Sequence, residues 1–307
     1  MGEWAGPISA FCSSVTWAIG TSGYSRLAKT YTPTRINFSR AAVGLPFFAV
    51  LAFVLAGGWN GGMQEFGKLT AAHWGWFALS MFSSYGIGDV LFFLSTRSLG
   101  VPGALAIASS YPLWTSLGGF WLRHEGVSTL QFVGLSITLS GIIVVILHGP
   151  KAEAKPVDHV VHRLDRKGVG IALAFATSLF WGLNTLAVSQ GGTGVNAGVA
   201  NTSRMVLALI ICFIVGRLGG DRTPPLLPAA EFKRSAWIFF AESVFGSFFF
   251  MFGLAHSPLV LGSTLVALSP VLAVPAAWML GGERPNLWRT TGVVLTVVGV
   301  WLLVSQR

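Results

Sequence analysis

The chain has 307 residues, of which 53% are hydrophobic and only 10% are charged. Soluble globular domains carry about 25% charged residues, so 20 Lys and Arg with 11 Asp and Glu are too few to cover a water-facing surface of this size. The composition excludes an ordinary soluble enzyme, a disordered chain and a disulfide scaffold, and it indicates an integral membrane protein. The net charge of +9 does not indicate a nucleic-acid partner, because the basic residues lie between apolar runs, where they orient membrane spans.

Ten apolar stretches are each long enough to cross a bilayer as a helix, which needs roughly 20 residues. The first five cover about residues 5–25, 34–57, 73–95, 101–122 and 129–148, and the second five cover about 168–188, 197–216, 235–254, 259–280 and 288–304. A hydrophilic segment with two prolines separates the two groups of five. The sequence therefore predicts an all-α membrane fold of ten helices, divided into units 1–148 and 168–307 and joined by a linker over 149–167.

The two halves match each other at fixed spacing. At an offset of 164, Asn37-Phe38-Ser39-Arg40 corresponds to Asn201-Thr202-Ser203-Arg204. At an offset of 158, the series Pro112, Glu125, Gly134, Gly141 corresponds to Pro270, Glu283, Gly292, Gly299. Because five is an odd number of helices, the second repeat enters the membrane from the opposite side, which predicts the inverted-topology repeat of many secondary transporters. A duplicated membrane scaffold or enzyme is the alternative.

This ordered set of residues resembles the EamA-type transporters of the drug/metabolite transporter superfamily, which have two five-helix repeats. The resemblance covers about residues 5–304. It rests on Trp17-Ala18 and Trp181-Gly182 in the first helix of each repeat, on Arg40 and Arg204 in the second, and on the matched Pro, Glu and Gly series. It implies transport of small metabolites across the cell (inner) membrane, often the export of amino acids or related compounds, and it does not fix the solute.

The basic residues are distributed unequally between the two sides. Of the 20 Lys and Arg residues, Arg40 and Arg204 lie inside spans, only Lys68, Arg123 and Arg307 fall on one side, and the remaining fifteen fall on the other. The positive-inside rule then places the linker in the cytoplasm and both termini outside. The resemblance implies termini inside, so both orientations stay open.

Four charged residues lie inside predicted spans, where charges are costly and usually functional. They are Arg40, Asp89, Arg204 and Glu242. Arg40 and Asp89 each lie about 10 Å from the same side of the membrane at 1.5 Å per residue, so they can form a pair, whereas Arg204 can reach toward the half that holds Glu242. Asp89 or Glu242 could titrate and couple transport to protons, or these charges could form static structural pairs. The repeats differ here, because Asp89 corresponds to Ser247 and Glu242 to Ser84, which suits an asymmetric solute.

Aromatic and polar residues in the middle of the spans are candidates for lining a central solute cavity. Aromatic walls with a few hydrogen-bonding groups suit an amphipathic solute, and aromatic faces attract ammonium groups. The same residues could instead serve helix packing. The candidate solute-binding residues are Trp17, Thr21, Trp181, Asn184, Tyr85, Tyr111, Trp114, Ser110 and Ser269.

Pro112 and Pro270 predict breaks in the fourth helix of each repeat, which we interpret as cavity-lining kinks and gate hinges. No nucleotide-binding, zinc-binding or serine-nucleophile motif is present, so we expect no cofactor or metal and energy from gradients or exchange. Gly86-Ile87-Gly88-Asp89 leaves an intramembrane aspartyl-type protease as a remote alternative, for which only Glu242 could be the second carboxylate. A sugar or nucleotide-type solute is the nearer alternative to an amino acid.

Overall fold

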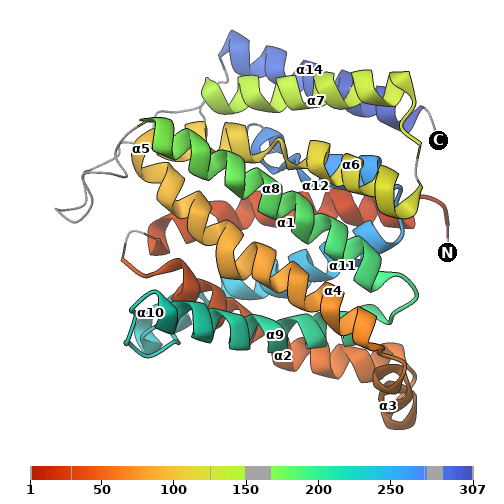
Figure 1. Cartoon of the computed structure of the whole chain (residues 1–307), viewed down its shortest axis with the longest axis vertical. Coiled ribbons are helices and arrows are strands. Elements are labelled where there is room, and N and C mark those ends of the chain that lie inside the picture. The colour runs from red at the N-terminus through yellow and green to blue at the C-terminus, as the bar shows by residue number, and fades with distance from the viewer. Residues whose placement is uncertain are drawn as a thin grey trace.

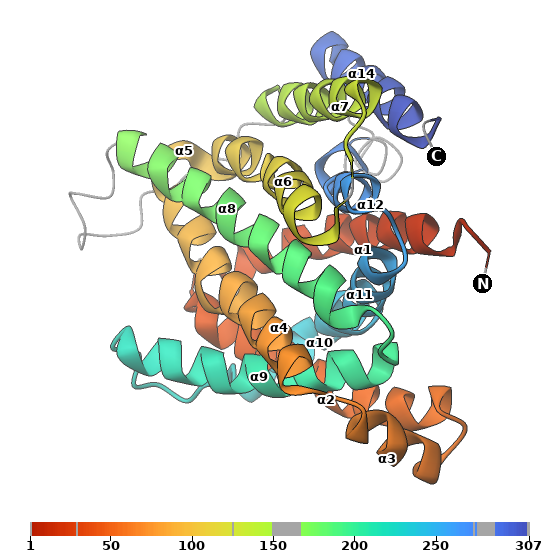
Figure 2. The same cartoon turned by 45° about the vertical axis from the view of Figure 1, so that its right-hand side comes forward.

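The computed structural model describes residues 2–28, 30–124, 126–148, 167–272, 274 and 286–305, and every regular element within them is helical. Figures 1 and 2 show the helices of the two halves intermingled rather than separated into two bodies. The first half contains α1 (Ala5–Leu27), α2 (Pro33–Leu55), the short α3 (Trp59–Gly67), α4 (Ala71–Met81), the π-helix η1 (Phe82–Gly88), α5 (Asp89–Ala108), α6 (Tyr111–Arg123) and α7 (Thr129–Leu147). The second half contains α8 (Lys167–Gly192), α9 (Ala197–Leu218), α10 (Ala229–Phe239), the π-helix η2 (Phe240–Gly246), α11 (Ser247–Ala255), α12 (Leu259–Val266) and α14 (Leu287–Val304).

Local sequence signals explain where several helices begin. The Ser128 hydroxyl accepts from the Gln131 backbone N–H at 3.1 Å, and the Gln131 side chain accepts from the Ser128 N–H in return, which forms a capping box before α7. Asn196 and Asn286 accept backbone N–H groups at the starts of α9 and α14. These polar caps mark where α7, α9 and α14 begin.

Seven described helical segments are long and apolar enough to cross a bilayer. They are Pro33–Leu55, Ala71–Thr96, Thr129–Leu147, Lys167–Gly192, Ala197–Leu218, Ala229–Ala255 and Leu287–Val304. The helix α1 has 23 residues but is less apolar than these segments, since it carries Ser13, Ser14 and Thr16 in its middle. The structure thus confirms an all-α membrane protein.

The predicted boundary between the third and fourth spans is wrong. We predicted separate spans over 73–95 and 101–122, but α5 continues through the residues between them and ends at Ala108. Figure 1 shows α5 bending where its colour changes from orange to yellow. The Gly and Pro of this stretch therefore do not end the helix.

The predicted fourth spans, 101–122 and 259–280, are interrupted at matched places. In the first half the break is the turn Ser109–Ser110, after which α6 begins at Tyr111. In the second half the break is the turn Ala267–Leu268, and helical residues resume at Ser269. The residues 273 and 275–285, which include Glu283, lie outside the described part of the chain, as do Glu125 and most of the predicted linker. The third helices also match, because η1 and η2 lie 158 residues apart, the offset of the repeat.

Each first helix packs against the opposite repeat. The helix α1 contacts η2, α11 and α12 of the second half, while α8 contacts α4, η1, α5 and α6 of the first half. The second helices α2 and α9 pack together, and so do the fifth helices α7 and α14. Both pairs run in opposite directions in Figures 1 and 2. Because each first helix lies against the opposite repeat, the third and fourth helices of both repeats surround one centre.

Candidate functional site

A cavity of about 130 Å³ lies where the two repeats meet. Its walls come from both halves, with side chains on α1, α2, η1, α5, α6, α8, α9, η2, α11 and α12. The charged and polar residues that line it are Ser13, Thr16, Arg40, Ser84, Asp89, Ser109, Asn184, Thr185, Arg204, Glu242, Ser247 and Ser269. The aromatic residues that line it are Trp17, Tyr85, Tyr111, Trp181 and Phe250.

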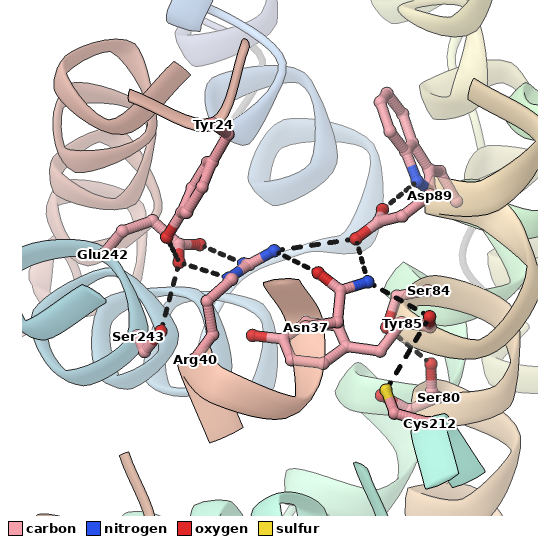
Figure 3. Close-up of polar contacts among 11 residues, drawn as sticks. Tyr24, Asn37, Arg40, Ser80, Ser84, Tyr85, Asp89, Cys212, Glu242 and Ser243 are labelled. Carbon is pink, nitrogen blue, oxygen red and sulfur yellow. Dashed lines mark hydrogen bonds and ion pairs between the residues drawn. The ribbon is translucent and has the colours of Figure 1, made fainter. Parts of the chain in front are cut away.

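Arg40 of α2 and Glu242 of η2 form the central ion pair of the cavity. The Arg40 Nη2 lies 2.7 Å from Oε1 of Glu242, and Nε donates to Oε2 at 3.1 Å, so the pair is bidentate. The Tyr24 hydroxyl donates to the same Oε2 at 2.7 Å (Figure 3). Both members of the pair are buried. A bidentate geometry with a further donor is what a buried pair requires to offset the cost of desolvation.

Asp89, at the start of α5, is the second carboxylate next to Arg40. Its Oδ2 lies 3.6 Å from the Arg40 Nη1, which is longer than the contacts of Glu242. Asn37 donates to Oδ2 at 2.9 Å, and the Trp181 indole N–H donates to Oδ1 at 3.2 Å. Figure 3 shows Arg40 between Glu242 on one side and Asp89 on the other. The predicted Arg40–Asp89 pair is therefore present, but Glu242 is the closer partner of Arg40.

Aromatic rings surround the Arg40 guanidinium. Its central carbon lies 4.5 Å from the centroid of Tyr85, 4.6 Å from that of Tyr24 and 5.6 Å from that of Trp17. Cation–π attraction of this kind stabilises a desolvated cation by about 2 kcal/mol or more per site. The rings and the two carboxylates together explain how an arginine is tolerated at this depth.

Arg204 of α9 lines the same cavity without a carboxylate partner among the described residues. Its Nη1 donates to Asn201 Oδ1 at 2.9 Å, and its Nε donates to the Ser80 hydroxyl at 3.2 Å. Ser80 in turn donates to Asn184. Arg204 is only 3% exposed, and its guanidinium carbon lies 5.8 Å from the centroid of Phe250. Arg204 makes no ion pair with Glu242 among the described residues, and both Glu242 oxygens bind Arg40.

The structure brings most of the predicted solute-binding residues to this cavity. Six of the nine line it, namely Trp17, Tyr85, Tyr111, Trp181, Asn184 and Ser269.

The other three predicted residues do not join them in the described structure. The Trp114 indole N–H donates to Ser178 at 2.8 Å in the α6–α8 contact, and the Ser110 hydroxyl donates to its own helix at the Ile107 carbonyl, so neither lines the cavity. The backbone of Thr21 belongs to α1, but its side chain lies outside the described part.

The two prolines lie beside the cavity, not in its wall. Pro112 is the second residue of α6, where its missing N–H costs no helical hydrogen bond, and the preceding Tyr111 lines the cavity. Ser269, the residue before Pro270, also lines the cavity. The predicted lining role therefore belongs to the neighbours of the prolines, and the helix breaks at both sites are confirmed. Their role as hinges stays a prediction.

Sequence reasoning missed several residues of the site. Tyr24 has no distinguishing motif, and only its spacing of seven residues from Trp17 on one helix face could have indicated it. Asn37 was noted only as part of a repeat motif, yet it links Arg40 to Asp89. Ser13, one turn before Trp17, and Thr16, directly before it, also line the cavity. Among the described residues, no group of three or more His, Cys, Asp or Glu side chains is arranged to hold a metal ion.

A polar, aromatic-walled cavity enclosed by two matched sets of membrane helices defines a multi-pass membrane transporter. The chain belongs to the EamA-like transporter family, which matches residues 4–147 and 168–305, once in each half. It therefore also belongs to the drug/metabolite transporter superfamily.

The fold is shared with a solved structure described only as "Crystal structure of protein". The two chains superpose with a TM-score of 0.72 at 16% sequence identity, over 98% of this chain and 96% of the other. At this identity the likeness concerns the fold alone. Comparison with curated proteins gives no significant match.

Proposed function

We propose that the protein is a secondary transporter that exports a small amphipathic metabolite, an amino acid or a related compound, across the cell (inner) membrane by alternating access. The observation that carries this proposal is the cavity between the repeats, where two arginines, two carboxylates and five aromatic rings face one space. Such a lining offers partners for a carboxylate, an ammonium group and an apolar side chain at the same time.

The size of the cavity supports a small solute. A space of about 130 Å³ has room for on the order of ten waters. This suits a solute of metabolite size. A sugar or nucleotide-type solute is the alternative within transport, and the two arginines of the cavity supply few cations for it.

The proposal includes ten membrane spans in an inverted 5+5 arrangement, with units 1–148 and 168–307 joined by the linker 149–167. It is supported by the opposite directions of α2 and α9 and of α7 and α14, and by the reciprocal packing of α1 and α8 on the other repeat. Inverted repeats allow one repeat to rock against the other around a fixed central site.

The drive is either the gradient of the solute itself or the proton gradient, because the sequence has no ATP-binding motif. Asp89 is the better candidate for carrying a proton. Protonation of Glu242 would disrupt a bidentate pair and the bond from Tyr24, whereas Asp89 has only one longer ionic contact, at 3.6 Å. A carboxylate with a weaker ionic partner loses less by taking up a proton.

An aspartyl-type protease is disfavoured by the same geometry. That chemistry needs two carboxyl groups that share one proton. Here the Arg40 guanidinium lies between Asp89 and Glu242 and binds both (Figure 3).

Counterflow in proteoliposomes tests the proposal. Purified protein is loaded with a mixture of unlabelled L-amino acids and offered the labelled mixture, with and without an imposed pH gradient. We expect accumulation of label above that in protein-free liposomes. Accumulation that matches the protein-free control for every amino acid would overturn the amino-acid proposal, and sugars, nucleosides and quaternary amines would form the next panel.

A further inference from the structure

Arg204 occupies an unusual position for a buried arginine. It is 3% exposed, lines the central cavity and has only neutral hydrogen-bond partners, Ser80 and Asn201, among the described residues. Removing a guanidinium from water without a counter-charge is expensive. The protein therefore maintains a buried cation that faces the solute space.

The corresponding arginine of the other repeat, Arg40, shows which partners Arg204 lacks. Arg40 is its counterpart, and the two share their local geometry, because each donates through Nη1 to the Asn three residues earlier at 2.9 Å. Arg40, however, also binds two carboxylates, Glu242 and Asp89.

The residues that correspond to these two carboxylates in the opposite repeat are serines. Ser84 corresponds to Glu242 and Ser247 to Asp89 at the repeat offset of 158, and both serines line the cavity. Ser80, which accepts from the Arg204 Nε, lies one turn before Ser84 and so places the guanidinium near that turn. The second half-site thus has the cation and, within the described residues, lacks its anion.

We propose that Arg204 binds the carboxylate of the solute, which takes the place beside Arg204 that Glu242 takes beside Arg40. This inference rests on the proposed function and names its substrate class, a solute with one free carboxylate. A planar guanidinium whose Nη2 has no protein partner among the described residues matches a carboxylate better than it matches a neutral amide.

The charge balance of the cavity favours a zwitterion over a dianion. Two guanidinium groups face two carboxylates, so the empty site is neutral when all four are ionised. A zwitterion keeps this balance if its carboxylate binds Arg204 and its ammonium group lies near Asp89, the carboxylate with the longer ionic contact. A phosphate dianion would leave an uncompensated buried charge.

The experiment places a protein carboxylate where the solute carboxylate should bind. Ser84→Glu reproduces the residue found at the corresponding position of the other repeat, and Ser84→Gln is the matched neutral control. The probes are the labelled L-amino acid mixture and the corresponding mixture of amino acid amides. Counterflow and the midpoint temperature of unfolding are measured for both variants, for Arg204→Gln and for the double variant Ser84→Glu with Arg204→Gln.

We expect the carboxylate introduced by Ser84→Glu to pair with Arg204 and exclude the solute. Counterflow of amino acids should be at least about 30-fold lower in Ser84→Glu than in Ser84→Gln, the lower end for losing one partner of a buried charge pair. The wild type should move the amino acids and not the amides. The new pair should also raise the unfolding midpoint of Ser84→Glu above that of Ser84→Gln by about 2–4 °C or more, and Arg204→Gln should abolish that rise.

Two outcomes of the transport measurements would overturn the inference. One is equal counterflow in Ser84→Glu and Ser84→Gln, and the other is equal transport of amides and amino acids by the wild type. If the wild type transports neither mixture, the proposed function fails. The unfolding midpoints then still decide whether Arg204 accepts a carboxylate at this place, since an absent rise in Ser84→Glu would overturn the inference on its own.

Discussion

Arg40 and Glu242 come from opposite repeats and form a bidentate ion pair, with contacts of 2.7 and 3.1 Å. The pair connects the second helix of one repeat to the π-helix of the other. Because Asp89 lies 3.6 Å from the same guanidinium, a single cation holds three elements, α2, η2 and α5, around the cavity. A solute or proton that changes either carboxylate would act on contacts between the repeats, which are the contacts that alternating access must rearrange.

Removal of one partner of the Arg40–Glu242 pair should destabilise the protein more than removal of both. A single loss leaves an uncompensated buried charge and typically costs about 3–5 kcal/mol. Arg40→Gln should cost more than Glu242→Gln, because it deprives both Glu242 and Asp89 of their cation. A double-mutant cycle by unfolding in detergent micelles measures the coupling, which we expect to reach about 1–3 kcal/mol.

Lys68→Gln serves as the control for this cycle. The lysine is 68% exposed and its partner Glu65 is 24% exposed, so loss of the lysine charge should change stability by less than about 1 kcal/mol. Strictly additive effects of the Arg40 and Glu242 variants would contradict a coupled buried pair.

The two carboxylates should differ in their effect on pH-driven transport. Asp89→Asn keeps one oxygen that can accept from Asn37 or Trp181 but removes the group that we expect to carry the proton. We expect this variant to lose its response to a pH gradient, while its counterflow is weakened by the loss of the carboxylate beside the ammonium group of the solute but stays above that of protein-free liposomes. Glu242→Gln should weaken both activities together, because it disrupts the bidentate pair. Uptake into proteoliposomes, measured with and without the pH gradient, distinguishes the effects of the two variants. Full pH-driven transport by Asp89→Asn would show that Asp89 is not the coupling residue.

The sequence predicted the components of this site better than their partners. Charge inside an apolar run identified Arg40, Asp89, Arg204 and Glu242, the repeat offset matched the two arginines, and a depth argument gave the Arg40–Asp89 contact. Depth does not determine which helix of the other repeat lies alongside, so the stronger partner of Arg40, Glu242, was missed. The π-helices add a further difficulty, since one inserted residue turns the following side chains to a different face of the helix.

The helix ends were likewise predicted well where a local sequence signal marks them and poorly where packing determines them. Spans with a polar cap or a Pro at the start, such as Pro33–Leu55, lie within about two residues of their predicted bounds. The bend in α5 and the breaks at Ser109–Ser110 and Ala267–Leu268 depend on packing around the cavity, for which Gly and Pro are only indirect indicators.

The stability of the protein should depend on pH through Asp221, which lies in the loop after α9. Thr32 donates to its Oδ2 at 2.7 Å and the Thr223 backbone N–H donates to its Oδ1 at 3.0 Å. Slight burial tends to raise the pKa of Asp221, but the hydrogen bonds from Thr223 and Thr32 outweigh it and lower the pKa below the ordinary value. A lowered pKa in the folded state stabilises the fold above the unfolded-state pKa of about 3.9, and this contribution is lost as the pH falls toward the folded-state pKa.

The measurement is the unfolding midpoint of wild type and Asp221→Asn between about pH 3 and 7. We expect the wild type to be more stable by a constant amount from about pH 5 upward, and the difference to shrink below about pH 4. A difference that grows on acidification would show that the sign of this argument is wrong.

The glycines of α7 and α14 should be sensitive to any added side chain. A Cβ on Gly141 would lie 2.6 Å from the Gly292 carbonyl oxygen, and a Cβ on Gly299 would lie 2.5 Å from the backbone nitrogen of Thr138. These distances place backbone against backbone, as small residues allow in membrane helix pairs. Since main chain cannot rotate out of the way, Gly141→Val must separate the two helices and should cost about 1–3 kcal/mol or more. Gly75→Val in α4 is the matched control, because a Cβ there meets no atom within 4 Å. Unfolding in detergent micelles distinguishes them, and equal losses for the two variants would mean that valine acts through helix propensity alone and that the α7–α14 contact does not require these glycines.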